Sequence, residues 1–329
     1  MTRTALAFAL SAFFALPASA QDAEPVLGAT TAAPAASADA VGPTAIAVGR
    51  LTAANRYTSA TYGVGGVGLR NRSEGGIEVS GVTGATKAAF LYWAVITLGA
   101  PPAAVTSVRL SRLYPTPLAG AIITGTAIGS GPQPCWLGDR ITVYKGTVPN
   151  GLANGNGFYR VQLNAGASGN TAGGDPWVAP FTLPLMEGAS LVIVGTGTGR
   201  VAIYDRGLAG TTFSGANGSP SLTYSLVLPA VSATTVQWDN IGADGQKGTS
   251  RTDVRAVSNE FTRINGILIA GPGSPATDSD WNGGVAGPLP QLWDNTGHRF
   301  TLRAGVAALN VAMTAASDCL TPVANVVSY

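Results

Sequence analysis

Histidine and charge are scarce in this sequence. Its 329 residues include one histidine, His298, and charged side chains make up only 11% of the total. A metalloenzyme that needs two or three histidine ligands is excluded by that count. The sequence has no Gly-x-Ser-x-Gly segment and so lacks the nucleophile elbow of a serine hydrolase. Lysine and arginine form no cluster and the formal net charge is +2, which argues against nucleic acid as a partner.

Long apolar runs are missing outside the N-terminus. Ala5–Leu16 is an apolar run behind Arg3, and Ala18-Ser-Ala20 has the small-residue pattern that signal peptidase reads. We therefore predict a signal peptide at residues 1–20 and an exported protein that is secreted or at the cell surface, with the periplasm as a further destination. The longest later apolar run, Ala88–Ile96, is too short to span a bilayer, so we expect no transmembrane segment after the leader is removed.

Cysteine is limited to Cys135 and Cys319. In an oxidising compartment two cysteines allow only one intramolecular pairing, so we predict a Cys135–Cys319 disulfide.

Glycine, by contrast, is abundant, with 44 residues. Frequent turns between apolar segments are typical of an all-β protein, and about 280 residues could form one large jelly roll or two packed β-sandwiches. The Ala-, Pro- and Thr-rich segment 21–50 is expected to be a flexible linker, followed by a β-sandwich region at 51–329. Within that region the glycine- and serine-rich segment 207–220 is the candidate subdomain boundary.

Individual strands are visible as apolar or alternating segments. Phe90–Ile96 is continuously apolar, which predicts a strand buried on both faces. Leu191–Val194 and Arg200–Tyr204 flank the glycine-rich segment Gly195–Gly199, which predicts a hairpin. Further strands, each continuous, are expected at Ile264–Ala270, Phe300–Ala304, Ala307–Thr314 and Val323–Tyr329.

Three segments in this part of the sequence resemble a known family. Phe90–Ile96, then Gly188–Gly195, then Arg200–Asp205 resemble the adhesin-like β-sandwich region of large secreted bacterial surface proteins, in which an LYW-type strand precedes a GxSLVVVY-type strand. The likeness covers residues 85–210, and Asp205-Arg-Gly207 departs from the Asp-Gly turn of that family. It implies an adhesin-like or structural surface role and supplies no catalytic residue.

The most specific local pattern is Asp278-Ser-Asp280-Trp-Asn282-Gly283. Oxygen ligands at alternate positions followed by glycine match the first half of a calcium-binding loop, so Asp278, Asp280 and Asn282 are candidate ligands for calcium. Position twelve of that loop would be Leu289 instead of a bidentate glutamate, and a solvated turn is the alternative interpretation.

Sugar chemistry is the other possibility that the residues leave open. Trp281 and Trp293 lie in loop-like sequence and are candidate exposed platforms for ligand stacking, whereas Trp93 is expected in the core. A glycoside hydrolase would need two facing carboxylates, and the spacing selects no pair from the six candidates. These are Asp139, Glu187, Asp239, Asp244, Glu260 and Asp294.

Taken together, the sequence predicts a secreted or surface-displayed, non-catalytic β-sandwich protein with a binding, adhesion or structural role. The sequence does not identify the partner, for which carbohydrate and another surface protein are the candidates, and calcium is the only candidate cofactor. A secreted carbohydrate-active hydrolase using a carboxylate pair, or an outer-membrane β-barrel, is the alternative.

Overall fold

The structure is a computed structural model that describes residues 26–27, 45–136, 138–174, 181–215, 218–229, 232–245, 260–274, 280–281, 292–315 and 318–329. Its elements are nineteen β-strands and one 3-10 helix within those ranges, so the predicted all-β class is confirmed. No helix in the described ranges has the length and hydropathy needed to cross a membrane.

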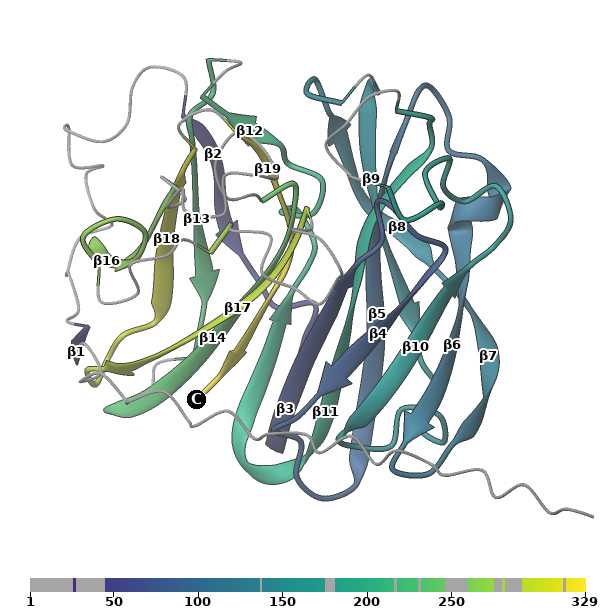
Figure 1. Cartoon of the computed structure of the whole chain (residues 1–329). Coiled ribbons are helices and arrows are strands. Elements are labelled where there is room, and N and C mark those ends of the chain that lie inside the picture. Colours follow the sequence, from purple (N-terminus) through teal and green to yellow (C-terminus); the bar gives the residue numbers. More distant parts are fainter. Residues whose placement is uncertain are drawn as a thin grey trace, which may run out of the picture.

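Two β-sandwiches lie side by side (Figure 1). In the first sandwich, a four-stranded sheet packs against one half of a ten-stranded sheet. The 3-10 helix Ala103–Thr106 leads into the four-stranded sheet. That sheet has the order β4 (Glu74–Val79), β10 (Gly157–Leu163), β6 (Ser107–Tyr114) and β7 (Leu118–Thr124). The half-sheet facing it consists of β3 (Asn55–Gly68), β11 (Leu185–Tyr204), β5 (Thr86–Thr97), β9 (Arg140–Thr147) and β8 (Thr126–Pro132).

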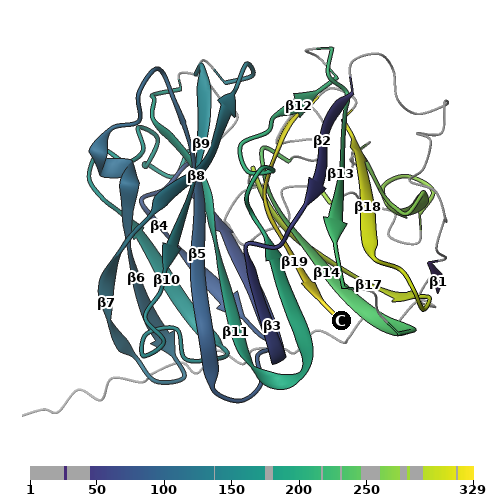
Figure 2. The same cartoon turned by 180° about the vertical axis from the view of Figure 1, so that it is seen from behind.

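The second sandwich uses the other half of the ten-stranded sheet. From β11 that half continues through β19 (Cys319–Ser328), β14 (Thr234–Ala243), β17 (Trp293–Leu302) and β1 (Val26–Leu27), and β12 (Phe213–Ser214) pairs with β19. A five-stranded sheet covers it, in the order β16 (Ile267–Ala270), β15 (Phe261–Ile264), β18 (Ala308–Thr314), β13 (Ser221–Val227) and β2 (Ile46–Leu51). Figure 2 shows both sandwiches from behind.

A bend in β3 and β11 carries the large sheet from one sandwich to the other. Thr196 and Gly199 both lie opposite Ala60, so the glycine-rich segment forms a bulge inside one strand. On β3, the neighbouring Ser59 has a positive φ of 48°. The predicted hairpin at Gly195–Gly199 is therefore wrong: its two arms do not pair with each other, because β3 pairs with both. Glycine supplies the backbone freedom that such a bulge requires.

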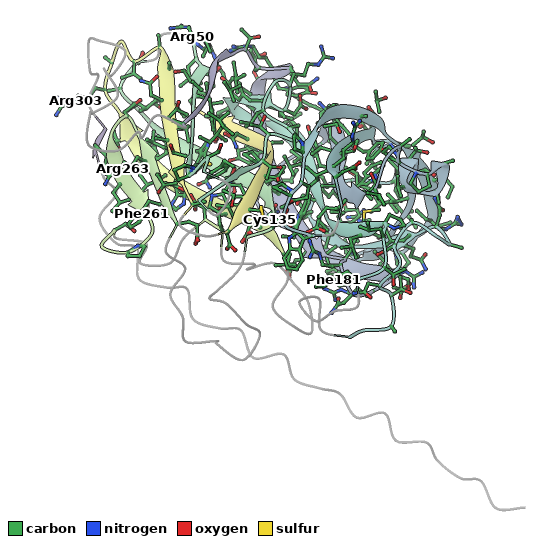
Figure 3. The ribbon with its side chains drawn as sticks, turned by 90° about the horizontal axis from the view of Figure 1, so that it is seen from above. Arg50, Cys135, Phe181, Phe261, Arg263 and Arg303 are labelled. Carbon is green, nitrogen blue, oxygen red and sulfur yellow. A yellow bond between two sulfur atoms is a disulfide. The ribbon has the colours of Figure 1, made fainter. Side chains whose placement is uncertain are left out.

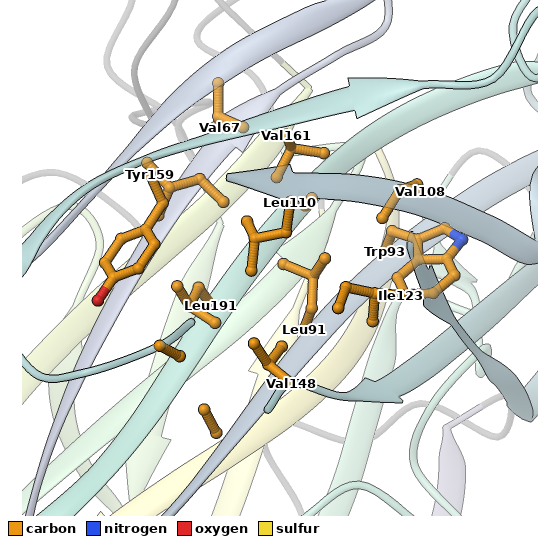
Figure 4. Packing of buried hydrophobic residues seen from close by; sticks show 14 of the residues in the cluster. Val67, Leu91, Trp93, Val108, Leu110, Ile123, Val148, Tyr159, Val161 and Leu191 are labelled. Atoms are coloured by element: carbon orange, nitrogen blue, oxygen red, sulfur yellow. The ribbon is translucent and has the colours of Figure 1, made fainter. Parts of the chain in front are cut away.

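Three apolar clusters result from this arrangement. One lies inside each sandwich, and the third, which we call the seam, lies between the two halves of the large sheet. Strand β5 contributes to two of them, because Leu91 and Trp93 face the first sandwich (Figure 4) while Phe90 and Tyr92 face the seam. The prediction that this strand is buried on both faces is confirmed.

Two further sequence predictions need correction. Residues 46–50, predicted as the end of a linker, begin β2, in which Ile46 and Val48 pack against the second core and the strand pairs in parallel with β13. The single strand expected at Ile264–Ala270 is the hairpin β15–β16, because Asn265 and Gly266 both adopt positive φ, as a two-residue type I′ turn requires. The segment 207–220 lies between β11 and β13 and includes β12.

Candidate functional site at the seam between the sandwiches

A charged cluster is buried where the two sandwiches meet. Arg70 follows β3, Glu187 lies on β11, and Asp244 follows β14. The Arg70 guanidinium donates to both carboxylate oxygens of Glu187 at 2.7 Å and to Asp244 Oδ1 at 3.0 Å. All three side chains are at most 1% exposed. The structure thus brings together two of the six carboxylates that the sequence offered, and it holds both on one arginine.

A short loop after β8 closes over this cluster. The Gln133 amide donates to Asp244 Oδ2, and the Gln133 Oε1 atom accepts from the Cys135 backbone N–H at 3.1 Å. The indole of Trp136 stacks on the Arg70 guanidinium, with 4.0 Å from Cζ to the ring centroid. The loop therefore excludes water from the ion pairs, which strengthens them.

The cluster has one cation for two carboxylates, and their titration reflects this. Burial raises the pKa of Asp244 well above its ordinary value, and the Glu187 charge raises it further. Burial also raises the pKa of Glu187, although Arg70 opposes that change. One cation beside two adjacent buried carboxylates therefore favours the protonated form of Asp244.

The predicted disulfide is confirmed and lies beside this cluster. Cys135 follows β8 of the first sandwich and Cys319 begins β19 of the second, with their Cα atoms 6.3 Å apart. Cys135 is marked in Figure 3. The bond therefore joins the two sandwiches covalently across the seam.

The single histidine forms a second buried pair. His298 Nε2 lies 2.6 Å from Asp280 Oδ1, and the imidazole stacks on Trp238 with ring centroids 5.8 Å apart. Burial lowers the pKa of His298, but the Asp280 charge and hydrogen bond outweigh it and the net shift is upward. Although burial opposes it, the His298 charge lowers the pKa of Asp280. The pair is therefore ionic at mildly acidic pH.

This pair predicts a pH-dependent contribution to stability. Because the folded pKa of His298 is raised, its stabilisation is complete below about pH 6.5 and is lost as the pH rises through the folded value. We expect His298→Gln to lower the free energy of unfolding by about 2 kcal/mol near pH 5.5, the scale of a hydrogen bond to a charged group. The difference from wild type should shrink at pH 9. Urea unfolding at the two pH values measures it, and an equal difference at both would contradict the ionic pair.

Only part of the calcium prediction falls on described residues. Asp278 and Asn282 lie outside them, while the Asp280 carboxylate is 1% exposed and bonded to His298. Calcium binding at Asp278, Asp280 and Asn282 stays a prediction.

The expectation that Trp281 and Trp293 are exposed is wrong, since both are fully buried. Trp281 packs edge-on against Phe213 in the second core, where the absence of a side chain at Gly242 makes room for its ring. Trp293 lies in the seam, and its Nε1–H donates to Ser190 Oγ at 2.9 Å. Their glycine- and proline-rich neighbours in the sequence predicted exposure, but the residues that bury the two rings are distant in sequence.

Further ionisable groups in the seam are paired. Lys145 Nζ lies 2.5 Å from Asp205 Oδ2, and the Tyr92 hydroxyl donates to the same carboxylate oxygen at 2.8 Å. The Tyr62 hydroxyl donates to Asp239. These contacts link β5 and β9 to the end of β11, and β3 to β14. The carboxylates of Asp205 and Asp239 are therefore both bound to protein side chains.

One sheet face presents apolar side chains to solvent. Five large apolar residues are exposed in the described part of the chain, and four of them lie on neighbouring strands of the four-stranded sheet. We call these four the outer sheet face: Leu113, Tyr114, Ile122 and Phe158.

Glycines form the floor of this face. The Phe158 ring lies over Gly76 at a distance that a Cβ atom would not permit, and the Arg109 side chain lies close over Gly120. Tyr114 and Phe158 are direct cross-strand neighbours. The outcome is a partly aromatic surface with arginine at its side.

Comparison with known proteins finds no family model that matches the chain and no curated protein with significant similarity to it.

Proposed function

We propose that this chain is an exported, non-catalytic binding protein that attaches to another protein at a cell surface through the outer sheet face. The observation that carries the proposal is the concentration of four of the five exposed large apolar side chains on one sheet. Exposed apolar side chains gathered on one part of a surface are typical of an interaction site. Tyrosine, phenylalanine and arginine are the residue types enriched at protein interfaces, which favours a protein as the partner.

The seam supports the non-catalytic part of the proposal. The carboxylates Glu187 and Asp244 are bound to Arg70 and covered by the Gln133–Trp136 loop, and Asp280 is bound to His298. A glycosidase needs its two carboxylates on either side of a scissile bond. Glu187 and Asp244 share one buried guanidinium and are close enough to hydrogen-bond each other, so the pair serves better as a structural clamp. The leader pattern at residues 1–20 supports export.

Site-specific photo-crosslinking tests the contact surface. We expect Tyr114→benzoylphenylalanine, in cells that export the protein, to yield a discrete higher-mass adduct after irradiation. Leu98 is the matched control, because it is 70% exposed compared with 67% for Tyr114 but lies outside the four-stranded sheet. The same probe at Leu98 should give no adduct, and the Phe158→Ala variant should weaken the adduct from position 114. The intact mass of the exported protein should equal that of a chain that begins at Gln21.

Four results would contradict the proposal. Equal adducts from positions 98 and 114, or none from 114, would remove the outer sheet face as the contact. Binding to purified peptidoglycan or chitin that requires Tyr114 and Phe158 would make the partner a polysaccharide. Release of reducing sugar that is lost in Glu187→Gln would make the protein an enzyme.

A further inference from the structure

Strand β7 forms a free edge of the four-stranded sheet. Its one neighbouring strand in the described part of the chain is β6, so the backbone N–H and C=O groups on its other side have no strand partner there. Figures 1 and 2 both show β7 at the outer margin of the first sandwich, on the side away from the second sandwich. An edge of this kind presents the hydrogen-bonding groups that another polypeptide strand needs.

Two other edge strands of the first sandwich are protected. At β4, Glu78 is exposed and adds a charge, and its carbonyl oxygen lies so close to Gly65 of β3 that a Cβ atom there would not fit. At β8, the Gly210 backbone, between β11 and β12, lies against Gly131 in the same way. Charge and close cover are among the usual means by which proteins prevent pairing at a strand edge.

Strand β7 has neither protection within the described part of the chain. Its seven residues, Leu118–Thr124, include no charged residue and no proline, and residues 113–138 are entirely uncharged. Each residue of the strand except Ile123 is at least partly exposed, and Ile122 is 54% exposed. The register shift against β6 lies before Ala121, so the rest of the strand is regular. A regular, uncharged edge favours strand pairing.

The absence of charge favours a second copy of the chain as the occupant. When identical strands pair, like charges that face each other are an obstacle, and β7 carries none. Arg109, which lies opposite Ile122, is on β6, one strand further in. Across a pairing of two β7 strands the two Arg109 residues would be three strand spacings apart, about 14 Å, which exceeds the Debye length of about 8 Å at physiological ionic strength.

Antiparallel pairing about a two-fold axis uses the whole strand when the axis passes Ala121, the central residue of Leu118–Thr124. Ile122 of each copy then lies opposite Gly120 of the other, and the two Ile122 side chains are diagonal neighbours roughly 7–8 Å apart. Pairing would thus remove part of each isoleucine from water. Because this axis is normal to the sheet, the two outer sheet faces would lie on the same side of one eight-stranded sheet.

We propose that the chain forms a homodimer in which β7 of one copy pairs antiparallel with β7 of a second copy. The contact is small, so the dissociation constant is expected in the micromolar range. This inference goes beyond the proposed function, because its partner is a second copy and its contact is the backbone edge of β7. By presenting two outer sheet faces together, the dimer would strengthen attachment to a surface through avidity.

Sedimentation equilibrium of the disulfide-intact protein from about 1 to 300 µM, a range that brackets micromolar affinity, tests the proposal. We expect a monomer–dimer equilibrium in wild type. Ile122→Lys should weaken it by about tenfold or more, because it replaces an apolar contact with two like charges beside the axis. Leu113→Lys is the matched control, since Leu113 is 40% exposed on the same sheet face but lies on β6. It should leave the dimer unchanged, and both variants should keep the urea unfolding midpoint of wild type.

A mixture of two charge variants makes the test specific to the edge. Ile122→Lys and Ile122→Glu should each be monomeric at concentrations where wild type is dimeric. Their mixture should form a heterodimer, because opposite charges then meet across the axis. Hydrogen exchange reads the backbone directly: the amides of β7 should exchange more slowly as the wild-type concentration rises, and those of the edge strand β4 should not.

Four results would overturn the dimer: a wild type that stays monomeric over the whole range, equal disruption by Leu113→Lys and Ile122→Lys, a mixture that stays monomeric, or exchange of β7 that does not respond to concentration. These measurements use the purified protein alone. A monomeric wild type would therefore leave the Tyr114 adduct with another protein in place, so failure of the dimer is distinguishable from failure of the proposed function.

Discussion

Replacing Arg70 by alanine is expected to lower the free energy of unfolding by about 3–5 kcal/mol at neutral pH, because removing one partner of a buried ion pair leaves the others uncompensated. Glu187 and Asp244 would both lose their guanidinium donor, and Trp136 would lose its stacking partner. Without Arg70, burial alone would raise the pKa of each carboxylate. The penalty should therefore be largest at pH 7.5 and smaller near pH 4.5, where protonation removes the buried charge. Urea unfolding at both pH values measures this.

Two variants make the interpretation specific. Asp244→Asn keeps hydrogen-bonding capacity and resembles the protonated acid, so we expect it to change stability at neutral pH by less than about 1 kcal/mol. Asp244 also has a φ of 73°, a conformation that asparagine tolerates well. Arg109→Ala, on the exposed sheet face, controls for loss of an arginine. A cost for Asp244→Asn as large as that for Arg70→Ala would show that Asp244 is ionised in the folded protein.

Removing the disulfide is the other change with a large expected effect. Cys135 and Cys319 are 184 residues apart, and closing a loop of that size restricts the unfolded chain by roughly 5 kcal/mol in the polymer-entropy argument. We expect the Cys135→Ser/Cys319→Ser double variant to lose about 2–5 kcal/mol of stability, the usual range for a native disulfide. Denaturant unfolding of this variant, of oxidised wild type and of wild type reduced with a phosphine measures it.

The reduced protein and the double variant should agree. An unchanged unfolding midpoint in both would mean that the noncovalent contacts of the seam alone hold the sandwiches together. A loss in the serine variant without one in the reduced protein would point to packing of the serine side chains instead of the covalent link.

Local pattern predicted the features that depend on neighbouring residues. The all-β class and the buried strand at Phe90–Ile96 follow from apolar runs between glycine-rich turns, and the disulfide follows because two cysteines allow one intramolecular pairing. The sequence could not distinguish a hairpin from a bulged bend at Gly195–Gly199, because the outcome is decided by β3, which pairs with both arms.

The charged cluster was beyond sequence reasoning for the same reason. Arg70 meets Glu187 across 117 residues and Asp244 across 174 residues, so no spacing rule selects these carboxylates from the six available. Trp281 and Trp293 were misjudged because Gly242 and Gly188 accommodate their rings from other strands. The only local signal was Arg70 at the end of an apolar strand, next to Arg72, and that pattern does not identify its partners.

The bend in β3 and β11 also governs how the chain can assemble. Two parts of the chain build the second sandwich. One part, β2 and the beginning of β3, precedes the first sandwich in sequence. The other part runs from the end of β11 to β19 and follows it. The first sandwich is thus a nested insertion in the second. Its strands are all available once residue 195 has emerged, whereas the second sandwich must wait for β19, which lies between β11 and β14 in the sheet. During synthesis or translocation the inner unit can fold first, and β2 must stay unpaired until β13 emerges.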